Sequence, residues 1–202
     1  MNDTDLTNRI DKCILKLKQK FCDIVHSRAT EEELLMFHFF REKYLQFVLY
    51  KLLIDDECLS KFSILWGYPT QLKFKRNGKS KKDTSGHHDL VIADEPTDRI
   101  FFGFELFLGY EHLEKHINSK EFRNHLQNDY NKLSSDKNIK KGYILNFFFR
   151  GNIPNRRSDG RTKAKLEAYK KHLHSCKKAV DEMKGSFPCG SIELMVFDES
   201  TC

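Results

Sequence analysis

One acidic residue lies in the middle of a strongly apolar segment. Glu105 interrupts the sequence Ile-Phe-Phe-Gly-Phe-Glu-Leu-Phe-Leu at residues 100–108. A glutamate is almost never fully buried without a partner, and an unpaired buried charge either neutralises or acquires a compensating charge. A metal ion or a cationic side chain would compensate it. A buried salt bridge with no catalytic role is the simpler alternative for Glu105.

A second carboxylate, Asp89, opens the preceding apolar segment. If residues 94–98 form the turn of an antiparallel hairpin, Asp89 pairs with Gly103 and Glu105 lies diagonal to it on the same face. Such neighbours are about 7–8 Å apart, so two flexible carboxylates could share one divalent ion. Oxygen ligands of this kind favour Mg²⁺ or Mn²⁺ over zinc. A turn or cap role is the alternative for Asp89.

Two histidines, His87 and His88, precede this aspartate directly. The imidazole group titrates near neutral pH and also binds metals, so either residue could act as a general base or a metal ligand. A structural role at the start of a strand is the more common use of such a histidine, and we favour it here.

The periodicity of the chain predicts that these residues lie on a sheet flanked by helices. Helical spacing covers residues 5–25, about 30–54, 110–137 and 162–184, and strand-like patterns cover 71–76, 88–93, 99–108, 142–149 and 191–197. The order α-α-β-β-β-α-β-α-β predicts a single α/β domain over residues 1–202, a mixed sheet flanked by helices. Helices occupy residues 1–58 and the sheet core 59–202.

Composition excludes several classes of protein. The 202 residues carry a formal net charge of +6, and no apolar run approaches the roughly 20 residues of a membrane span. The acidic first residues are followed by no apolar stretch, so we expect no signal peptide. Six scattered cysteines without a C-x-x-C pair are typical of reduced thiols in a cytoplasmic protein.

Two basic segments could contact a polyanion. Residues 73–82 and 150–165 each hold six lysines and arginines. Solvated surface charge is one explanation, and a grip on a phosphate backbone is the other. The residues that we expect to contact nucleic acid are Lys73, Lys75, Arg76, Lys79, Arg156 and Arg157.

The order of elements and the acidic residues resemble the PD-(D/E)XK nuclease superfamily. The resemblance covers roughly residues 42–149: a helix with Glu42, Gly-x-x-Asp-Leu-Val-Ile ending in residue 92, an apolar strand with Glu105, and a helix with Asp129-x-x-Lys132-Leu133. It implies a restriction-endonuclease-like core that hydrolyses phosphodiester bonds. It also implies a divalent ion held by Asp89, Glu105 and the backbone carbonyl of Leu106, with Glu42 beside it.

The sequence departs from the superfamily pattern at one position. The catalytic lysine belongs two residues after Glu105, where this chain has Phe107, and a phenyl ring cannot orient water or stabilise a phosphate. Some members recruit the cation from another element. The candidates are Lys115, Lys120 and Lys132 on the following helix and Lys73 and Lys75 on the preceding strand.

We therefore expect a Mg²⁺- or Mn²⁺-dependent nuclease that acts on DNA or RNA without membrane association, with a homodimer as one option for its assembly. A nuclease-fold module that binds nucleic acid or a partner without cutting is the main alternative, and Phe107 favours it. A small-molecule or nucleotide-processing enzyme is a third possibility, but no glycine-rich phosphate loop supports it.

Overall fold

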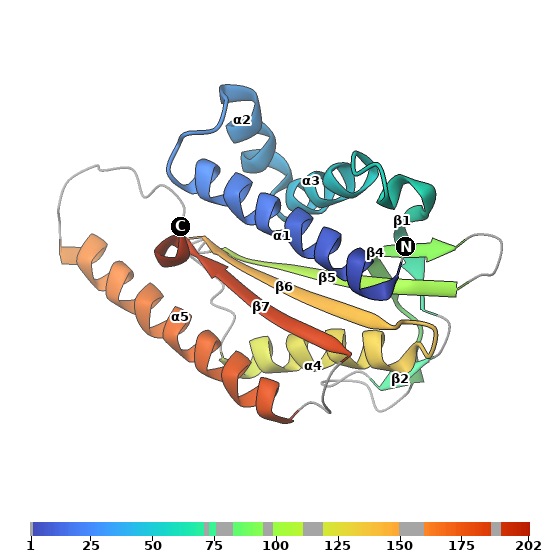
Figure 1. Cartoon of the computed structure of the whole chain (residues 1–202). Coiled ribbons are helices and arrows are strands. Elements are labelled where there is room, and N and C mark those ends of the chain that lie inside the picture. Colours follow the sequence, from blue (N-terminus) through green and yellow to red (C-terminus); the bar gives the residue numbers. More distant parts are fainter. Residues whose placement is uncertain are drawn as a thin grey trace.

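Three helices at the N-terminal end pack on one face of the sheet. The computed structural model describes residues 2–70, 73–75, 83–94, 99–110, 119–149, 160–186 and 191–202. In it α1 spans Asp3–Val25, α2 spans Glu31–Phe40 and α3 spans Glu42–Ile54. The apolar residues of α1 recur at helical spacing and are buried, so this helix lies along the sheet with its polar face outward (Figure 1).

The helix expected over residues 30–54 is in fact two helices. The chain breaks at Arg41, which has φ 50° and ψ −111°, a backbone conformation that non-glycine residues seldom adopt. The break brings the rings of Phe37 and Tyr44 to 6.1 Å between centroids. It also makes Glu42 the first residue of α3, where the positive end of the helix dipole favours a carboxylate.

The sheet is mixed, which confirms the α/β class. Its strands run in the order β1-β4-β5-β6-β7, with β1, β4 and β5 antiparallel and β5, β6 and β7 parallel. The strands are β1 (Ser63–Pro69), β4 (His87–Asp94), β5 (Arg99–Tyr110), β6 (Lys141–Phe149) and β7 (Ile192–Asp198).

Two of the expected element boundaries were wrong. The edge strand is β1, at residues 63–69. Of the strand expected at 71–76 the structure describes residues 73–75, and Phe74–Lys75 (β2) pairs with Asp83–Thr84 (β3) outside the main sheet. Tyr110 ends β5 and does not begin a helix. Periodicity failed in both places because a short edge strand and a strand end carry too few residues for a pattern.

The expected hairpin register was also wrong. Ala93 pairs with Ile100, but Ile92 pairs with Phe102, so β5 contributes one extra residue and the ladder contains a β-bulge. The bulge lies within an apolar segment and has no residue type that marks it. The alternation of polar and apolar residues therefore could not reveal it.

The observed register moves the residue that faces Asp89 by two positions. Arg99 pairs with Asp94 instead of Ala93, which shifts the register by one residue, and the bulge shifts it by one more. Leu90 pairs with Phe104, the last pair of this ladder. The next position on each strand is Asp89 on β4 and Glu105 on β5, so Glu105, rather than Gly103, lies opposite Asp89.

Two further helices cover the other face of the sheet, α4 (Ser119–Ser135) and α5 (Gly160–Ser186). α4 approaches closely at two glycines that face each other in adjacent strands, Gly103 and Gly142. A Cβ atom on Gly103 would lie 2.7 Å from Leu133 Cδ2, and one on Gly142 would lie 3.0 Å from Leu133 Cδ1. Leu133 therefore fits into space that only glycine leaves open.

The expectation that all cysteines are reduced was wrong for one pair. Cys22 of α1 forms a disulfide with Cys202, with Cα atoms 5.1 Å apart, whereas Cys13, Cys58 and Cys176 are free thiols. Sequence spacing could not indicate this bond because 180 positions separate the two residues. Among the described residues, none of the helices combines the length and apolarity needed to cross a bilayer.

Candidate active site

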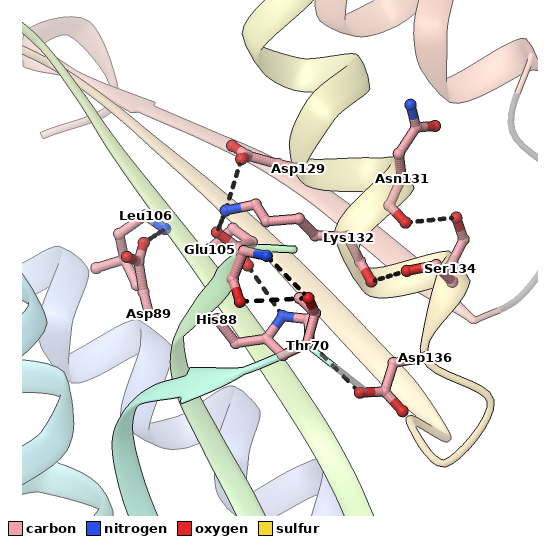
Figure 2. A network of polar contacts seen from close by, with 12 residues as sticks. Thr70, His88, Asp89, Glu105, Leu106, Asp129, Asn131, Lys132, Ser134 and Asp136 are labelled. Atoms are coloured by element: carbon pink, nitrogen blue, oxygen red, sulfur yellow. Dashed lines mark hydrogen bonds and ion pairs between the residues drawn. The ribbon is translucent and has the colours of Figure 1, made fainter. Parts of the chain in front are cut away.

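A row of charged side chains on α4 and in the turn after it faces the sheet. His125, Asp129, Lys132 and Asp136 are four, three and four residues apart, and this spacing places them on one side of a helix. The last of these follows the end of α4 and belongs to the turn that leads to β6. Figure 2 shows Asp129, Lys132 and Asp136 directed towards the strands that carry Glu105 and His88.

Glu105 has partners on both carboxylate oxygens. Its side chain is 1% exposed. Oε1 lies 3.0 Å from His88 Nδ1, and Oε2 accepts a hydrogen bond from Lys132 Nζ. Burial raises the pKa of Glu105 to about 7, while His88 and Lys132 oppose the rise and nearby acidic groups add to it. Glu105 is thus a buried carboxylate whose charge is compensated by protein partners.

Lys132 joins two acidic residues. Besides Glu105, its Nζ contacts Asp129 Oδ1 at 3.1 Å. Burial by itself would lower the pKa of this ammonium group, but Glu105 and Asp129 raise it well above its ordinary value, so Lys132 remains protonated. The neighbouring glycines explain its reach, because Leu133 packs against Gly103 and holds this turn of α4 near β5.

The row extends beyond these residues at both ends. His88 is completely buried, and its Nε2 lies 3.6 Å from Asp136 Oδ2. Burial would lower the pKa of His88, but the acidic groups of Asp136 and Glu105 raise it above its ordinary value. At the other end, His125 Nε2 lies 3.0 Å from Asp129 Oδ2.

Phe107 packs against this histidine. The ring centroids of Phe107 and His125 are 4.6 Å apart, and Phe122 lies beside them at 5.4 Å from Phe107. The residue at the superfamily's lysine position therefore belongs to the apolar packing between β5 and α4, and the cation next to Glu105 comes from Lys132.

Asp89 and Glu42 accept hydrogen bonds from the backbone N–H groups of alternate residues on one edge of β5. The N–H of Leu106 donates to Asp89 Oδ2 at 2.7 Å, and the N–H of Leu108 donates to Glu42 Oε2 at 3.2 Å. Alternate residues of a strand direct their N–H groups to the same edge. The two carboxylates therefore take over where backbone pairing between β4 and β5 ends.

Asp89 and Glu105 do not share a face, contrary to the expectation. Leu90 is buried in the core beneath α1 and α3, yet His88, two residues earlier, contacts Glu105 on the α4 side. Because residues two apart in a regular strand share a face, β4 changes face at Asp89. Figure 2 shows Asp89 beside Leu106, while Glu105 points towards Lys132.

The acidic groups nevertheless influence one another. Burial raises the pKa of Asp89, and the nearby charges of Lys132 and Asp129 act on it in opposite directions. Burial also raises the pKa of Glu42, and the charge of Asp89 adds to that rise. The charge of Asp89 raises the pKa of Glu105 as well. Asp89 thus lies within electrostatic reach of both Glu42 and Glu105.

A divalent cation would relieve this repulsion, and the donors partly fit one. Mg²⁺ is usually bound through one or two carboxylates together with water and substrate oxygens. Asp89 supplies one carboxylate, and the carbonyl of Leu106 points to the same edge as its N–H, beside Asp89. Glu105 lies on the other face, and both of its oxygens already have protein partners. Among the described residues, no three His, Cys, Asp or Glu side chains gather closely enough to hold a metal ion by themselves.

The other residues expected at the site have different outcomes. Lys120 is exposed on the first turn of α4, and Lys73 is exposed between β1 and β2. Within the part of the chain that the structure describes, neither lysine contacts Glu105, whose partners are His88 and Lys132. The remaining expected residues or their side chains lie outside the described residues: Lys75, Arg76, Lys79, Lys115, Arg156 and Arg157.

The sequence reasoning missed two members of the site. It named His88 and quoted Asp129 but passed over His125 and Asp136, which extend the row at its ends. The spacing of four, three and four residues was a usable signal, because charged residues at that spacing on a helix packed against a sheet must be paired.

No family model, curated protein or solved structure matches this chain.

Proposed function

We propose that this chain is a divalent-metal-dependent nuclease with a restriction-endonuclease-like core, which hydrolyses phosphodiester bonds in DNA or RNA. The observation that supports this most is the contact between Lys132 and Glu105. Phe107 removes the lysine expected on β5, and α4 supplies a protonated amine to the same carboxylate from a different element.

Each residue then has a distinct task. Asp89 and the carbonyl of Leu106 would hold the cation, with Glu42 beside them on α3, while Glu105 on the α4 side would position Lys132. A bound cation would lower the pKa of a water molecule and offset the charge of the transferring phosphate. Lys132 would orient the attacking water and donate hydrogen bonds to the phosphate as its negative charge grows. His88 would hold the carboxylate of Glu105 in place through Oε1.

The decisive experiment combines cleavage with thermal melting. Single- and double-stranded DNA and RNA are incubated with the protein and Mg²⁺ or Mn²⁺, and the melting midpoint is recorded with and without metal. A cation that binds the native state raises the melting midpoint by mass action. At a free concentration of one hundred times its Kd, it adds about 2.7 kcal/mol to the free energy of unfolding. We expect cleavage of at least one substrate and a metal-dependent rise.

Two variants separate holding the metal from using it. Asp89→Asn should abolish both the metal-dependent rise and the cleavage. Lys132→Met should abolish cleavage but keep the rise, and Lys178→Met, an exposed lysine on α5, is the matched control with wild-type behaviour. Cleavage that persists in Asp89→Asn, or a folded wild-type protein that neither cleaves nor responds to metal, would overturn the proposal.

A second candidate is a module with the nuclease fold that binds nucleic acid without cutting it. The fact that both oxygens of Glu105 already have protein partners favours it. In that case the protein would bind nucleic acid, but metal would not raise its melting midpoint. The same melting experiment therefore distinguishes the two candidates.

A further inference from the structure

Three aromatic rings form a partly exposed stack beside the candidate site. Trp66 of β1 lies beside Phe47 and Tyr50 of α3, with ring centroids 6.5 Å and 5.6 Å away and interplanar angles of 26° and 33°. Trp66 is 41% exposed and Phe47 is 44% exposed. We call these three residues the aromatic platform.

The platform is held rigidly by a buried amide. Gln46 is completely buried, and its Oε1 accepts hydrogen bonds from Trp66 Nε1 at 3.3 Å and from Lys43 Nζ at 2.7 Å. A ring fixed in this way loses little conformational freedom when a ligand stacks on it. Lys43 is itself exposed, so its remaining donors face solvent.

The platform lies next to the carboxylates. Trp66 pairs with Leu90, the neighbour of Asp89. On α3, Phe47 lies five residues beyond Glu42, which is roughly 7.5 Å along the helix axis. Burial raises the pKa of both Glu42 and Asp89, and the positive charge of Lys43 opposes that rise, so this lysine lies within electrostatic reach of the acidic groups. In Figure 1, α3 passes over β1 and β4 at this place.

We propose that the aromatic platform stacks unpaired bases, so that the substrate is single-stranded or locally unpaired nucleic acid. Flat rings beside lysines are the features that proteins use for single strands, because every base has a π face and every linkage a phosphate. A duplex hides its base faces inside the helix and cannot use the platform. This inference rests on the proposed function, since it identifies the substrate of that site.

Charge supports a nucleic acid as the occupant of this surface. Lys43 and Lys51 are exposed on α3, one about a turn before Phe47 and one about a turn after it. The chain has a net charge of +6. A purely apolar protein partner would cover these exposed ammonium groups without offering them a counter-charge, which is costly. The phosphates of a strand whose bases stack on the rings would meet both lysines.

The tryptophan provides a direct test because Trp66 is the single tryptophan of the chain. Oligo-dT, oligo-U and a dT–dA duplex are titrated into the protein in EDTA, so that no cleavage occurs. We expect each single strand to quench the Trp66 emission in a saturable way and the duplex to have little effect.

Substitutions of Phe47 test the stack without removing the reporter. Phe47→Ala should weaken single-strand binding about tenfold, the effect of losing stacking on one base. Phe47→Leu keeps apolar bulk, and therefore packing, but has no π face. It should weaken single-strand binding to the same extent. Phe39→Ala is the matched control, because Phe39 is 68% exposed on α2, outside the platform.

The outcomes separate this inference from the proposed function. Quenching by single strands without any cleavage in metal would refute the nuclease and leave the platform intact. Cleavage without quenching, or a duplex that quenches as strongly as a single strand, would refute the platform. Emission that changes with protein concentration in the absence of nucleic acid would indicate a second protein chain as the occupant and would also refute it.

Discussion

Six titratable side chains form a row of alternating charge between α4 and the sheet. In order along the row they are His125, Asp129, Lys132, Glu105, His88 and Asp136. Each acidic member lies between or beside basic members, so each buried charge is compensated. Removing one basic member leaves the neighbouring carboxylates in an apolar setting without that compensation, which is costly.

His88 provides the test of this row at the scale of a single residue. We expect His88→Ala to lower the free energy of unfolding by about 3–5 kcal/mol, because Glu105 and Asp136 both lose a buried partner. Urea denaturation measures the effect. His87→Ala is the control, since the preceding histidine is exposed and should change stability by less than about 0.5 kcal/mol. Equal effects of the two substitutions would contradict the pairing of His88.

At the scale of elements, the position of α4 against β5 decides which lysine reaches Glu105. Leu133 packs against the paired glycines Gly103 and Gly142. This contact brings the adjacent Lys132 within hydrogen-bond distance of the carboxylate. Lys120, on the first turn of the same helix, is exposed instead.

Gly103→Ala should push α4 away from the sheet. Its Cβ would meet Leu133 Cδ2 at 2.7 Å and Ile139 Cδ1 at 2.9 Å, and overpacking of this kind costs about 1–3 kcal/mol. Leu133→Ala removes one of the two clashing groups. In a double-mutant cycle by urea denaturation, the combined loss should be smaller than the sum of the single losses by more than about 0.5 kcal/mol. Additive losses would show that α4 does not depend on this contact.

At the scale of the whole molecule, the end of the chain is tied to both helical layers. Asp198, at the end of β7, is completely buried and pairs with Lys177 of α5, and its Oδ1 accepts a hydrogen bond from the N–H of Ser200 at 2.7 Å. The disulfide between Cys202 and Cys22 joins the same segment to α1.

This anchoring predicts how stability depends on pH. Burial would raise the pKa of Asp198, but Lys177 and Ser200 lower it below the ordinary value of 3.8. An acid with a lowered pKa in the folded state stabilises the protein above its ordinary pKa, and that contribution is lost as pH falls through the lowered value. Asp198→Asn should therefore lower the free energy of unfolding by about 1–3 kcal/mol near neutral pH.

The difference between the wild type and Asp198→Asn should shrink as the pH falls below about 3.8. Urea denaturation over a series of pH values measures it. Asp181→Asn, an exposed aspartate on α5, is the comparison and should show no such trend. A difference that stays constant into acid would mean that the charge of Asp198 does not contribute to stability.

Much of the architecture could be predicted from local patterns. The helical spacing in α1 and the apolar segments of β5 and β6 indicated their elements, because a buried face repeats along a single element. The buried position of Glu105 and the need for a partner followed from its apolar neighbours. Its partner could be narrowed only to a few lysines, Lys132 among them.

The remaining features depended on tertiary structure. Four features arise where separate elements meet: the choice of Lys132, the register that brings Glu105 opposite Asp89, the change of face at Asp89 and the break at Arg41. A sequence pattern reports which side of one element is apolar, but not how far that element is shifted or rotated against the next. That shift is set by contacts such as Leu133 against Gly103, which join residues far apart in the chain.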